Sequence, residues 1–387
     1  MILIDHPFVS DFLIKTIKEN NFEIVATSQA EELIKDSSLN WISEKEAKET
    51  IIKHPKTLVY TNSENSISWV FENLKKTKLP HQIQFFKDKL KFRELIKDLF
   101  PDFVFKTIEL EEIQNLEVSN SDFPFVIKPA IGFFSIGVHI IHNLSDWEAA
   151  KKELNYENLK SMYPKNVMDA STFIIEEYIE GEEFAIDCYF DNDGNAVILS
   201  ILHHKFSSGS DVSDRMYSTS KNIIQTYKKP IEAFLNPIGR KADLKNFPIH
   251  IEVRIDASGK ITPIEVNPLR FGGWCTTADL TWHAYGINSY EHFLNNKKPD
   301  WEEIFNTRKD KIYSIIILNN NSGVEASEIS SFDYNLLEQD LENCLELRKL
   351  DIKKDPVFGF VFSETSLDNE RELDEMLVSD LRRYIIV

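Results

Sequence analysis

Two carboxylates and one amide in the second half of the chain have the types and spacing of ligands for a hard cation. Glu252 lies in an alternating run at 249–255, and Glu265 and Asn267 lie two residues apart in the run that begins at 261. The turn at 256–259 ends in glycine, which tolerates positive φ, so the two runs predict a β-hairpin. Paired strands would bring the three side chains together. Mg²⁺ prefers such oxygens and leaves positions for substrate phosphates.

This hairpin alone does not decide between two interpretations. A half-exposed antiparallel hairpin also places polar residues on its solvated face, without any bound ion. The choice therefore depends on the other residues of the chain that could do chemistry.

A lysine and a glycine-containing loop form a second candidate site. The apolar run 123–127 ends in Lys128, and the following loop contains Gly132, Ser135 and Gly137 before a strand at 138–141. A lysine at the end of a buried strand needs an anionic partner. The glycines allow backbone N–H groups to face a phosphate. A plain hairpin loop would explain the same residues.

Lys89 stands at the start of a predicted helix that begins at Asp88 and ends before Pro101. A cation in the first turn is opposed by the helix dipole. Lys89 is therefore either a solvated lysine or a residue with a separate task.

Residues 172–187 predict a strand, a bend and a second strand. Backbone groups at a strand end can recognise an adenine, and a carboxylate can bind a ribose; an acidic surface hairpin is the alternative. A strand at 196–203 precedes Lys205 and the polar segment 207–220, which we expect to be a long loop. Long loops without secondary structure often act as lids.

The elements that must position these residues begin with a small α/β unit. Strands at 2–4, 22–26 and 57–60 and a helix at 9–20 predict a parallel sheet. The first glycine of the chain is Gly132, so the first unit lacks a dinucleotide-binding fingerprint. Further predicted elements are a helix at 145–160 with Ser145 as N-cap, a helix at 277–296, a linker at 297–310, a strand at 311–319, a helix near 333–345, a strand at 357–363 and a helix at 368–380.

The composition indicates a cytoplasmic protein. The 387 residues are 42% hydrophobic and contain three scattered cysteines, and we expect these thiols to be reduced. No apolar run is long enough for a membrane span, and the first residues do not resemble a signal peptide. The net charge of −19 argues against a nucleic-acid partner. A homodimer is the commonest state for such a protein.

Taken together and in their order along the chain, the four candidate segments resemble the ATP-grasp superfamily of ADP-forming carboxylate ligases. The family includes D-alanine–D-alanine ligase, the L-amino-acid ligases, biotin carboxylase and the large subunit of carbamoyl phosphate synthetase. The resemblance implies a Rossmann-like α/β pre-ATP-grasp domain at 1–85 and an ATP-grasp domain at 86–305. Within the latter it implies two α+β lobes with antiparallel sheets, a nucleotide-binding lobe at about 105–180 and a second lobe at about 181–300. A small C-terminal α/β subdomain at 306–387 has no counterpart from which a role transfers.

The resemblance also implies roles for single residues. Lys89 and Lys128 correspond to the lysines that contact nucleotide phosphates, and the loop with Ser135 and Gly137 to the loop that closes over them. The remaining correspondences are adenine binding by Glu176, Glu177, Tyr178 and Ile179, ribose binding by Glu183, phosphate or substrate contact by Lys205 and Arg215, Mg²⁺ ligation by Glu252, Glu265 and Asn267, and steadying of the acylphosphate by Arg270.

One departure from the family pattern affects the last of these roles. Leu269 is inserted before Arg270, so the arginine arrives one position late, and Arg254, on the strand face of Glu252, could share its task. The resemblance implies a carboxylate–amine ligase that uses ATP and Mg²⁺, or Mn²⁺ in its place, to join a small carboxylate such as an amino acid to an amine through an acylphosphate. The alternatives are ligation to a thiol or through carboxyphosphate, a nucleotide sensor without catalysis, and a binder of some other metabolite.

Overall fold

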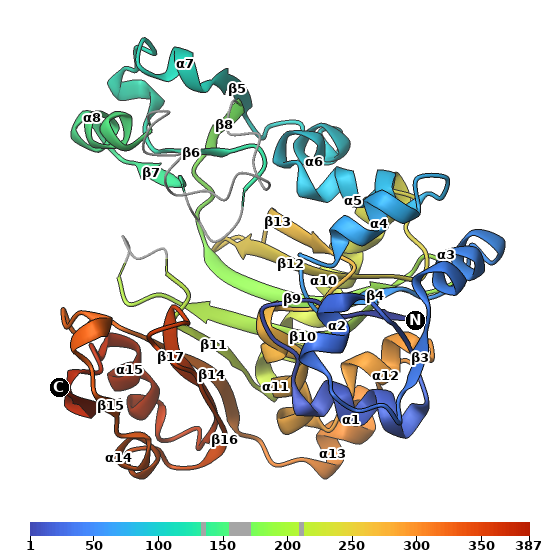
Figure 1. Ribbon diagram of the computed structural model, residues 1–387. Coiled ribbons are helices and arrows are strands. Elements are labelled where there is room, and N and C mark those ends of the chain that lie inside the picture. The colour runs from blue at the N-terminus through green and yellow to red at the C-terminus, as the bar shows by residue number, and fades with distance from the viewer. Residues whose placement is uncertain (133–136, 155–171, 209–212) are drawn as a thin grey trace.

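The computed structural model describes residues 1–132, 137–154, 172–208 and 213–387 (Figure 1). The chain begins with a four-stranded parallel sheet in the order β3-β2-β1-β4, which confirms the predicted parallel arrangement. Its strands are β1 (Ile2–Leu3), β2 (Glu23–Val25), β3 (Asn40–Ile42) and β4 (Tyr60–Thr61), and its helices are α1 (Asp11–Asn20), α2 (Ser28–Leu33), α3 (Glu44–Lys53) and α4 (Ile67–Asn73). Helix α1 shows the local logic, since Ser10 caps it and Leu13 and Ile17 face the core.

Two short helices, α5 (Leu79–Lys87) and α6 (Lys89–Ile96), connect this first sheet to the rest of the molecule. Asp88 separates them and caps α6, because its side chain accepts hydrogen bonds from the amides of Leu90 and Lys91. The cap fixes the start of α6 and thereby the position of Lys89 in its first turn.

A small antiparallel sheet with the order β5-β8-β6-β7 forms a separate lobe, at the top of Figure 1. It contains β5 (Phe105–Glu109), β6 (Phe125–Pro129), β7 (His139–Ile141) and β8 (Thr172–Glu177), with α7 (Leu110–Ile113) and α8 (Leu144–Glu153). Its own apolar core includes Ile127, Trp147 and Phe173. The lobe therefore has a hydrophobic core of its own, separate from the core of the large sheet.

The largest sheet has eight antiparallel strands in the order β13-β12-β9-β10-β11-β14-β17-β16. Its first part consists of β9 (Glu182–Phe190), β10 (Ala196–Lys205), β11 (Met216–Thr219), β12 (Phe247–Ile255) and β13 (Ile261–Pro268). The helices α10 (Lys221–Lys241), α11 (Thr276–Tyr285), α12 (Ser289–Leu294) and α13 (Trp301–Thr307) accompany it. Strands β12 and β13 form the predicted hairpin, at one edge of the sheet.

The C-terminal residues extend the same sheet. Strands β14 (Ile312–Asn319), β16 (Cys344–Lys349) and β17 (Val357–Thr365) continue it, and α14 (Tyr334–Gln339), α15 (Glu370–Val378) and the pair β15 (Ser331–Phe332) and β18 (Ile385–Ile386) complete the C-terminal unit. This unit has a second core around Phe358 and Leu373. The antiparallel sheets agree with the α+β lobes predicted for the second and third quarters of the chain, whereas the predicted domain boundaries stay predictions.

Several predicted elements are wrong in detail. Asn143, and not Ser145, caps α8, and residues 155–160 of the predicted helix fall outside the described residues. Residues 216–219, predicted as loop, pair with β10 and β14, and Met216, Ser218 and Thr219 are buried. The helix predicted at 277–296 is broken at Gly286, whose φ is 69°.

Three further corrections concern regions that look polar or irregular in sequence. The charged segment 297–310 contains helix α13, capped by Asp300. The helix predicted at 333–345 ends at Gln339, and strand β16 begins at Cys344. No element was predicted for the 21-residue helix α10, which holds two prolines. Among the described residues, no helix is long and apolar enough to cross a membrane.

Candidate functional site

The hairpin of β12 and β13 brings the predicted cation ligands together. Glu252 is the cross-strand partner of Glu265, and His250 is the partner of Asn267. Directly opposed residues share one face of a sheet, so both carboxylates point to the same side. The Asn267 amide donates to Glu265 Oε1 at 3.4 Å. The convergence predicted from the alternating sequence is therefore present in the structure.

Charge is unevenly shared between the two carboxylates. Burial, together with the neighbouring Glu265 and Glu183, raises the pKa of Glu252 to about 6. Burial also opposes ionisation of Glu265, but Lys89 and Lys128 outweigh it and lower the pKa of that carboxyl. His250 Nε2 lies 3.6 Å from Glu252 Oε1 and offsets part of this effect. The neighbouring carboxylates still leave Glu252 in an environment that favours a bound cation.

Lys89 links the hairpin to the glycine-containing loop. Its Nζ lies 3.6 Å from Glu265 Oε2 and donates to the carbonyl of Gly132 at 3.4 Å. Its backbone amide donates to the carbonyl of Ala130 at 2.8 Å. The lysine that the helix dipole disfavours therefore has partners in both lobes.

Lys128 is nearly buried and forms an ion pair with Glu176, a residue that we had expected to line the adenine site. Arg93 of α6 binds the same carboxylate through Nε at 2.8 Å and Nη2 at 3.1 Å. Its Nη1 donates to the carbonyl of Pro263 at 2.6 Å, two residues before Glu265. Burial would raise the pKa of Glu176, but Lys128 and Arg93 lower it to about 2.

Arg93 was not predicted as a site residue. It connects α6, β8 of the small lobe and β13 of the large sheet, so it lies where the two lobes meet. In sequence it looks like an ordinary helical arginine, and only its place near the apolar stripe of α6 could have marked it as buried.

Arg254 lies against the segment between the lobes. Its Nε donates to Glu183 Oε2 at 3.1 Å and its Nη1 to the carbonyl of Ile179 at 2.7 Å. The guanidinium also stands over the Tyr178 ring, 5.1 Å from its centroid. His204 Nδ1 contacts the other oxygen of Glu183 at 2.8 Å. The structure thus groups Arg254 with the predicted adenine and ribose residues.

Gly181 explains how this segment comes so close to β12. Its φ is +120°, and a Cβ at this position would collide with the carbonyl of Ile255. Only glycine takes this backbone conformation without strain. The bend between β8 and β9 is therefore built for close approach.

Arg270 follows the hairpin and lies within 4.0 Å of Glu64, which belongs to the loop after β4. Its Nη1 donates to the carbonyl of Phe271 at 2.9 Å. Lys87, at the end of α5, forms an ion pair with the same Glu64. Burial, with Lys89 and Arg270 nearby, lowers the pKa of Lys87 to about 7. Neither Glu64 nor Lys87 was singled out from the sequence.

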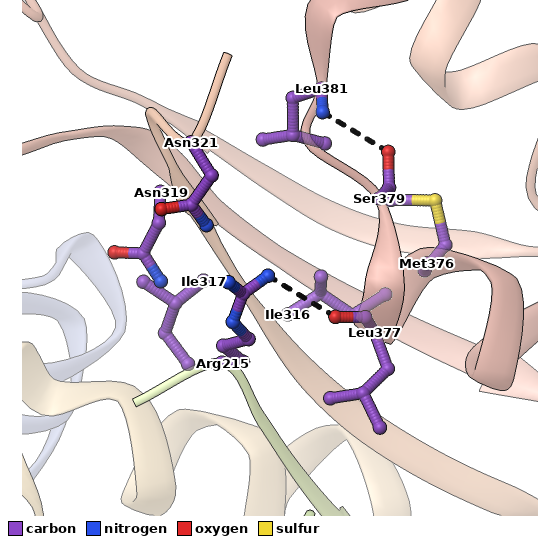
Figure 2. Close-up of a pocket in the computed structure, with 9 residues that line it drawn as sticks. All are labelled: Arg215, Ile316, Ile317, Asn319, Asn321, Met376, Leu377, Ser379 and Leu381. Atoms are coloured by element: carbon purple, nitrogen blue, oxygen red, sulfur yellow. Dashed lines mark hydrogen bonds between the residues drawn. The ribbon is translucent and has the colours of Figure 1, made fainter. Parts of the chain in front are cut away.

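Several predicted residues are not brought into this arrangement. Lys205 shares a strand face with His203, opposite to the face that His204 and Glu183 share. Arg215 lies in a small pocket of the C-terminal unit, where its Nη1 donates to the carbonyl of Leu377 at 3.3 Å (Figure 2).

The loop after β6 is described only in part. Ser135 falls outside the described residues, whereas Gly137 is described and has a φ of 73°. The glycine predicted from its type thus uses the positive φ that other residues avoid.

The carboxylates fit Mg²⁺ better than a metal held by protein alone. Within the described ranges, no three His, Cys, Asp or Glu side chains are grouped closely enough to form a metal site. Glu252, Glu265 and the amide oxygen of Asn267 are instead a partial set of hard oxygen ligands. Mg²⁺ typically takes one or two protein carboxylates and completes its shell with water and substrate phosphates.

Comparison with known proteins agrees with the family resemblance expected from the sequence. Residues 121–278 match the family model of the ATP-grasp domain. Over 121 residues the chain is 28% identical to D-alanine–D-alanine ligase of Lacticaseibacillus casei strain BL23, and this match covers 27% of this chain and 30% of that protein. Over 193 residues it is 25% identical to alanine–anticapsin ligase of Bacillus amyloliquefaciens, and this match covers 44% of this chain and 38% of that protein. The chain therefore spans about a third of the length of these curated relatives.

The fold extends further than the sequence similarity. The crystal structure of L-amino acid ligase from Bacillus licheniformis superimposes with a TM-score of 0.69 at 16% identity, covering 100% of this chain and 97% of that chain. At this identity the likeness shows the fold alone. Together, the family match and the fold confirm the predicted resemblance to the ATP-grasp proteins.

Proposed function

Since residues 121–278 form an ATP-grasp domain, we propose that the chain is an ADP-forming ligase that joins the carboxylate of an amino acid to an amine. The observation that carries the proposal is the cross-strand pairing of Glu252 with Glu265 beside a lysine. Lys89 Nζ lies 3.6 Å from Glu265 Oε2 and donates to the carbonyl of Gly132. Paired carboxylates beside lysines are the groups that phosphoryl transfer requires. The names of the two relatives, D-alanine–D-alanine ligase and alanine–anticapsin ligase, favour an amino-acid substrate.

The nucleotide would lie between the two lobes. Backbone groups of Glu177 and Ile179 would bind adenine. Glu183 would bind the ribose with the carboxylate oxygen that contacts His204 in the structure, so that contact would be given up. Glu176 would act indirectly, since it is buried between Lys128 and Arg93 and holds Lys128 for a phosphate.

Glu252, Glu265 and Asn267 would hold Mg²⁺, or Mn²⁺ in its place. When bound, the ion neutralises charge on the transferring phosphate. Lys89 and Lys128 supply fixed positive charge beside the same phosphates, so the protein contributes positioning and electrostatics and forms no covalent intermediate.

The reaction proceeds in two steps. A carboxylate oxygen of the first substrate attacks the γ-phosphorus of ATP, the bond to the β-phosphate oxygen breaks, and an acylphosphate and ADP result. The nitrogen of the neutral amine then attacks the acyl carbon, phosphate leaves, and the amine loses a proton to give the amide. Arg270 would steady the acylphosphate, whose dianionic phosphate needs a cation beside it.

The direct test is the release of ADP and phosphate on mixing the chain with ATP, Mg²⁺ and pairs of amino acids. We expect ADP release only when an acid and an amine are both present, with an amide product of the summed mass less water. Glu265→Gln should reduce turnover at least 100-fold, whereas Glu375→Gln, which alters an exposed carboxylate, should not change it. Formation of AMP and pyrophosphate would contradict the acylphosphate route. ADP release that requires a thiol or bicarbonate would replace the amine with that acceptor.

A further inference from the structure

The loop that follows the hairpin holds an unusual backbone conformation. Leu269, Trp274 and Cys275 have φ values of 61°, 57° and 59°, in the left-handed region. Residues other than glycine rarely adopt that region, and each one there strains the backbone. The loop persists only because its surroundings determine it, so the contacts that hold it are informative.

Each of three parts of the chain holds this loop by a hydrogen bond. The amide of Thr61, in the first sheet, donates to the carbonyl of Leu269 at 2.8 Å. Asp187 of β9 accepts from the amide of Gly272 at 3.0 Å. Arg348 of β16 donates from Nη1 to the carbonyl of Trp274 at 2.7 Å. The C-terminal unit, which has no predicted role, thus reaches the loop by a hydrogen bond from Arg348, and Phe360 of β17 packs against the Trp274 ring with 5.6 Å between the centroids.

Arg348 is built into its place. It is 7% exposed, and its Nη2 donates to Asp279 Oδ2 at 2.8 Å and to Glu346 Oε1 at 2.9 Å. Its guanidinium also stands over the rings of Phe8 and Phe362, 4.7 and 5.0 Å from their centroids. A guanidinium has donors in a fixed planar fork, so it can bind the loop carbonyl and the first helix after the loop at once; an ammonium group cannot reproduce this.

We propose that Arg348 is a positioning residue of the ligase, which sets the conformation of residues 270–276 and through it the direction of Arg270. The inference rests on the proposed function, because Arg270 is the candidate that steadies the acylphosphate. Arg270 has a side chain that is 12% exposed, and its Nη1 is bonded to the next carbonyl of the same loop. A shift of the loop therefore moves its guanidinium. Through Arg348, the C-terminal unit would take part in the reaction without contacting the nucleotide.

The test compares Arg348→Met and Arg348→Lys with Arg383→Met. The last removes an arginine of the same unit whose side chain is 65% exposed and whose partner is Asp340. We expect Arg348→Met to lower kcat about 100-fold, as a misplacement of about 1 Å does, and to leave KM for ATP within twofold. Arg348→Lys should recover only part of kcat, and Arg383→Met should behave as wild type. Because Arg348 acts through Arg270, adding Arg348→Met to Arg270→Met should slow turnover no further.

Amide hydrogen exchange provides a readout that does not need turnover. In folded Arg348→Met we expect exchange at 270–276 to accelerate at least tenfold, with 182–190 unchanged. Unchanged exchange at 270–276, or additive losses in the double variant, would overturn the role of Arg348. If the wild-type chain releases ADP with no substrate pair, the proposed ligase function fails, and the exchange experiment still decides whether Arg348 holds the loop.

Discussion

The buried contact of Arg93 with Glu176 should contribute far more to stability than an exposed contact of the same kind. The two side chains are each 2% exposed, and Arg93 Nε lies 2.8 Å from Glu176 Oε2. The chain offers a matched control, because Arg371 Nε lies 2.7 Å from Glu375 Oε1 while these side chains are 86% and 63% exposed. The Nε–Oε distances are alike, but the contact of Arg93 with Glu176 is buried and made through two nitrogens, whereas that of Arg371 with Glu375 is exposed and made through one.

The magnitude follows from what each substitution leaves behind. Arg93→Met removes the bonds to Glu176 and to the carbonyl of Pro263, and among the described residues the buried carboxylate then keeps Lys128 as its one ion-pair partner. Removal of one partner of a buried ion pair typically costs about 3–5 kcal/mol, whereas exposed pairs contribute about 0.2–1 kcal/mol. We therefore expect Arg93→Met to lower the free energy of unfolding by about 3–5 kcal/mol and Arg371→Met by less than about 1 kcal/mol.

Urea unfolding, followed by both tryptophan fluorescence and far-UV circular dichroism, measures these differences where the two probes coincide. A double-mutant cycle with Glu176→Gln should give a coupling energy of about 2–3 kcal/mol, compared with about 0.3–0.5 kcal/mol for Arg371 and Glu375. Equal coupling energies in the two cycles would refute the reasoning. That result would mean that burial between the lobes does not strengthen the contact.

Three further predictions concern the site itself. Because burial and nearby carboxylates raise the pKa of Glu252 to about 6, protons should compete with Mg²⁺ for this carboxylate. Titration of Mg²⁺ into the ADP-bound chain should show a Mg²⁺ affinity that rises about tenfold from pH 5 to pH 7, and a flat profile would contradict the ligand assignment. Arg254→Met should weaken ATP binding about 10- to 100-fold, through loss of charged hydrogen bonds to Ile179 and its neighbours, with little change in kcat; an unchanged dissociation constant measured by calorimetry would place Arg254 elsewhere. Gly181→Ala should destabilise the chain by more than about 1 kcal/mol, since its φ is +120° and Ile255 leaves no room; an unaltered urea midpoint would count against that packing.

The parts that were predictable from sequence are those specified by local patterns. The hairpin is an example, because alternation and a glycine turn determine both strands and the shared face of Glu265 and Asn267. Lys89 and Lys128 also stood out locally, one at the wrong end of a helix and the other at the end of an apolar strand. In both cases the neighbouring residues carried the information.

What was missed depends on partners that are distant in sequence. Arg93 and Glu176 are 83 positions apart, and nothing near either residue marks the other. Arg348 and Trp274 are 74 positions apart, and their contact depends on β16 joining the large sheet. The order of the strands in that sheet cannot be read from the residues around either position. Helix α10 was obscured by Pro230 and Pro237, which ordinarily disfavour a helix interior, yet tertiary packing of its apolar face retains it.

The fate of a labelled oxygen decides whether this chain activates a carboxylate with ATP for capture by an amine. A candidate amino acid carrying ¹⁸O in its carboxylate is incubated with the chain, ATP, Mg²⁺ and an amine, and the released phosphate is analysed by mass spectrometry. Because the attacking carboxylate oxygen leaves with the phosphate, we expect one ¹⁸O atom in each phosphate, equimolar with ADP and amide. Unlabelled phosphate accompanying ADP and amide would rule out attack of the carboxylate on ATP.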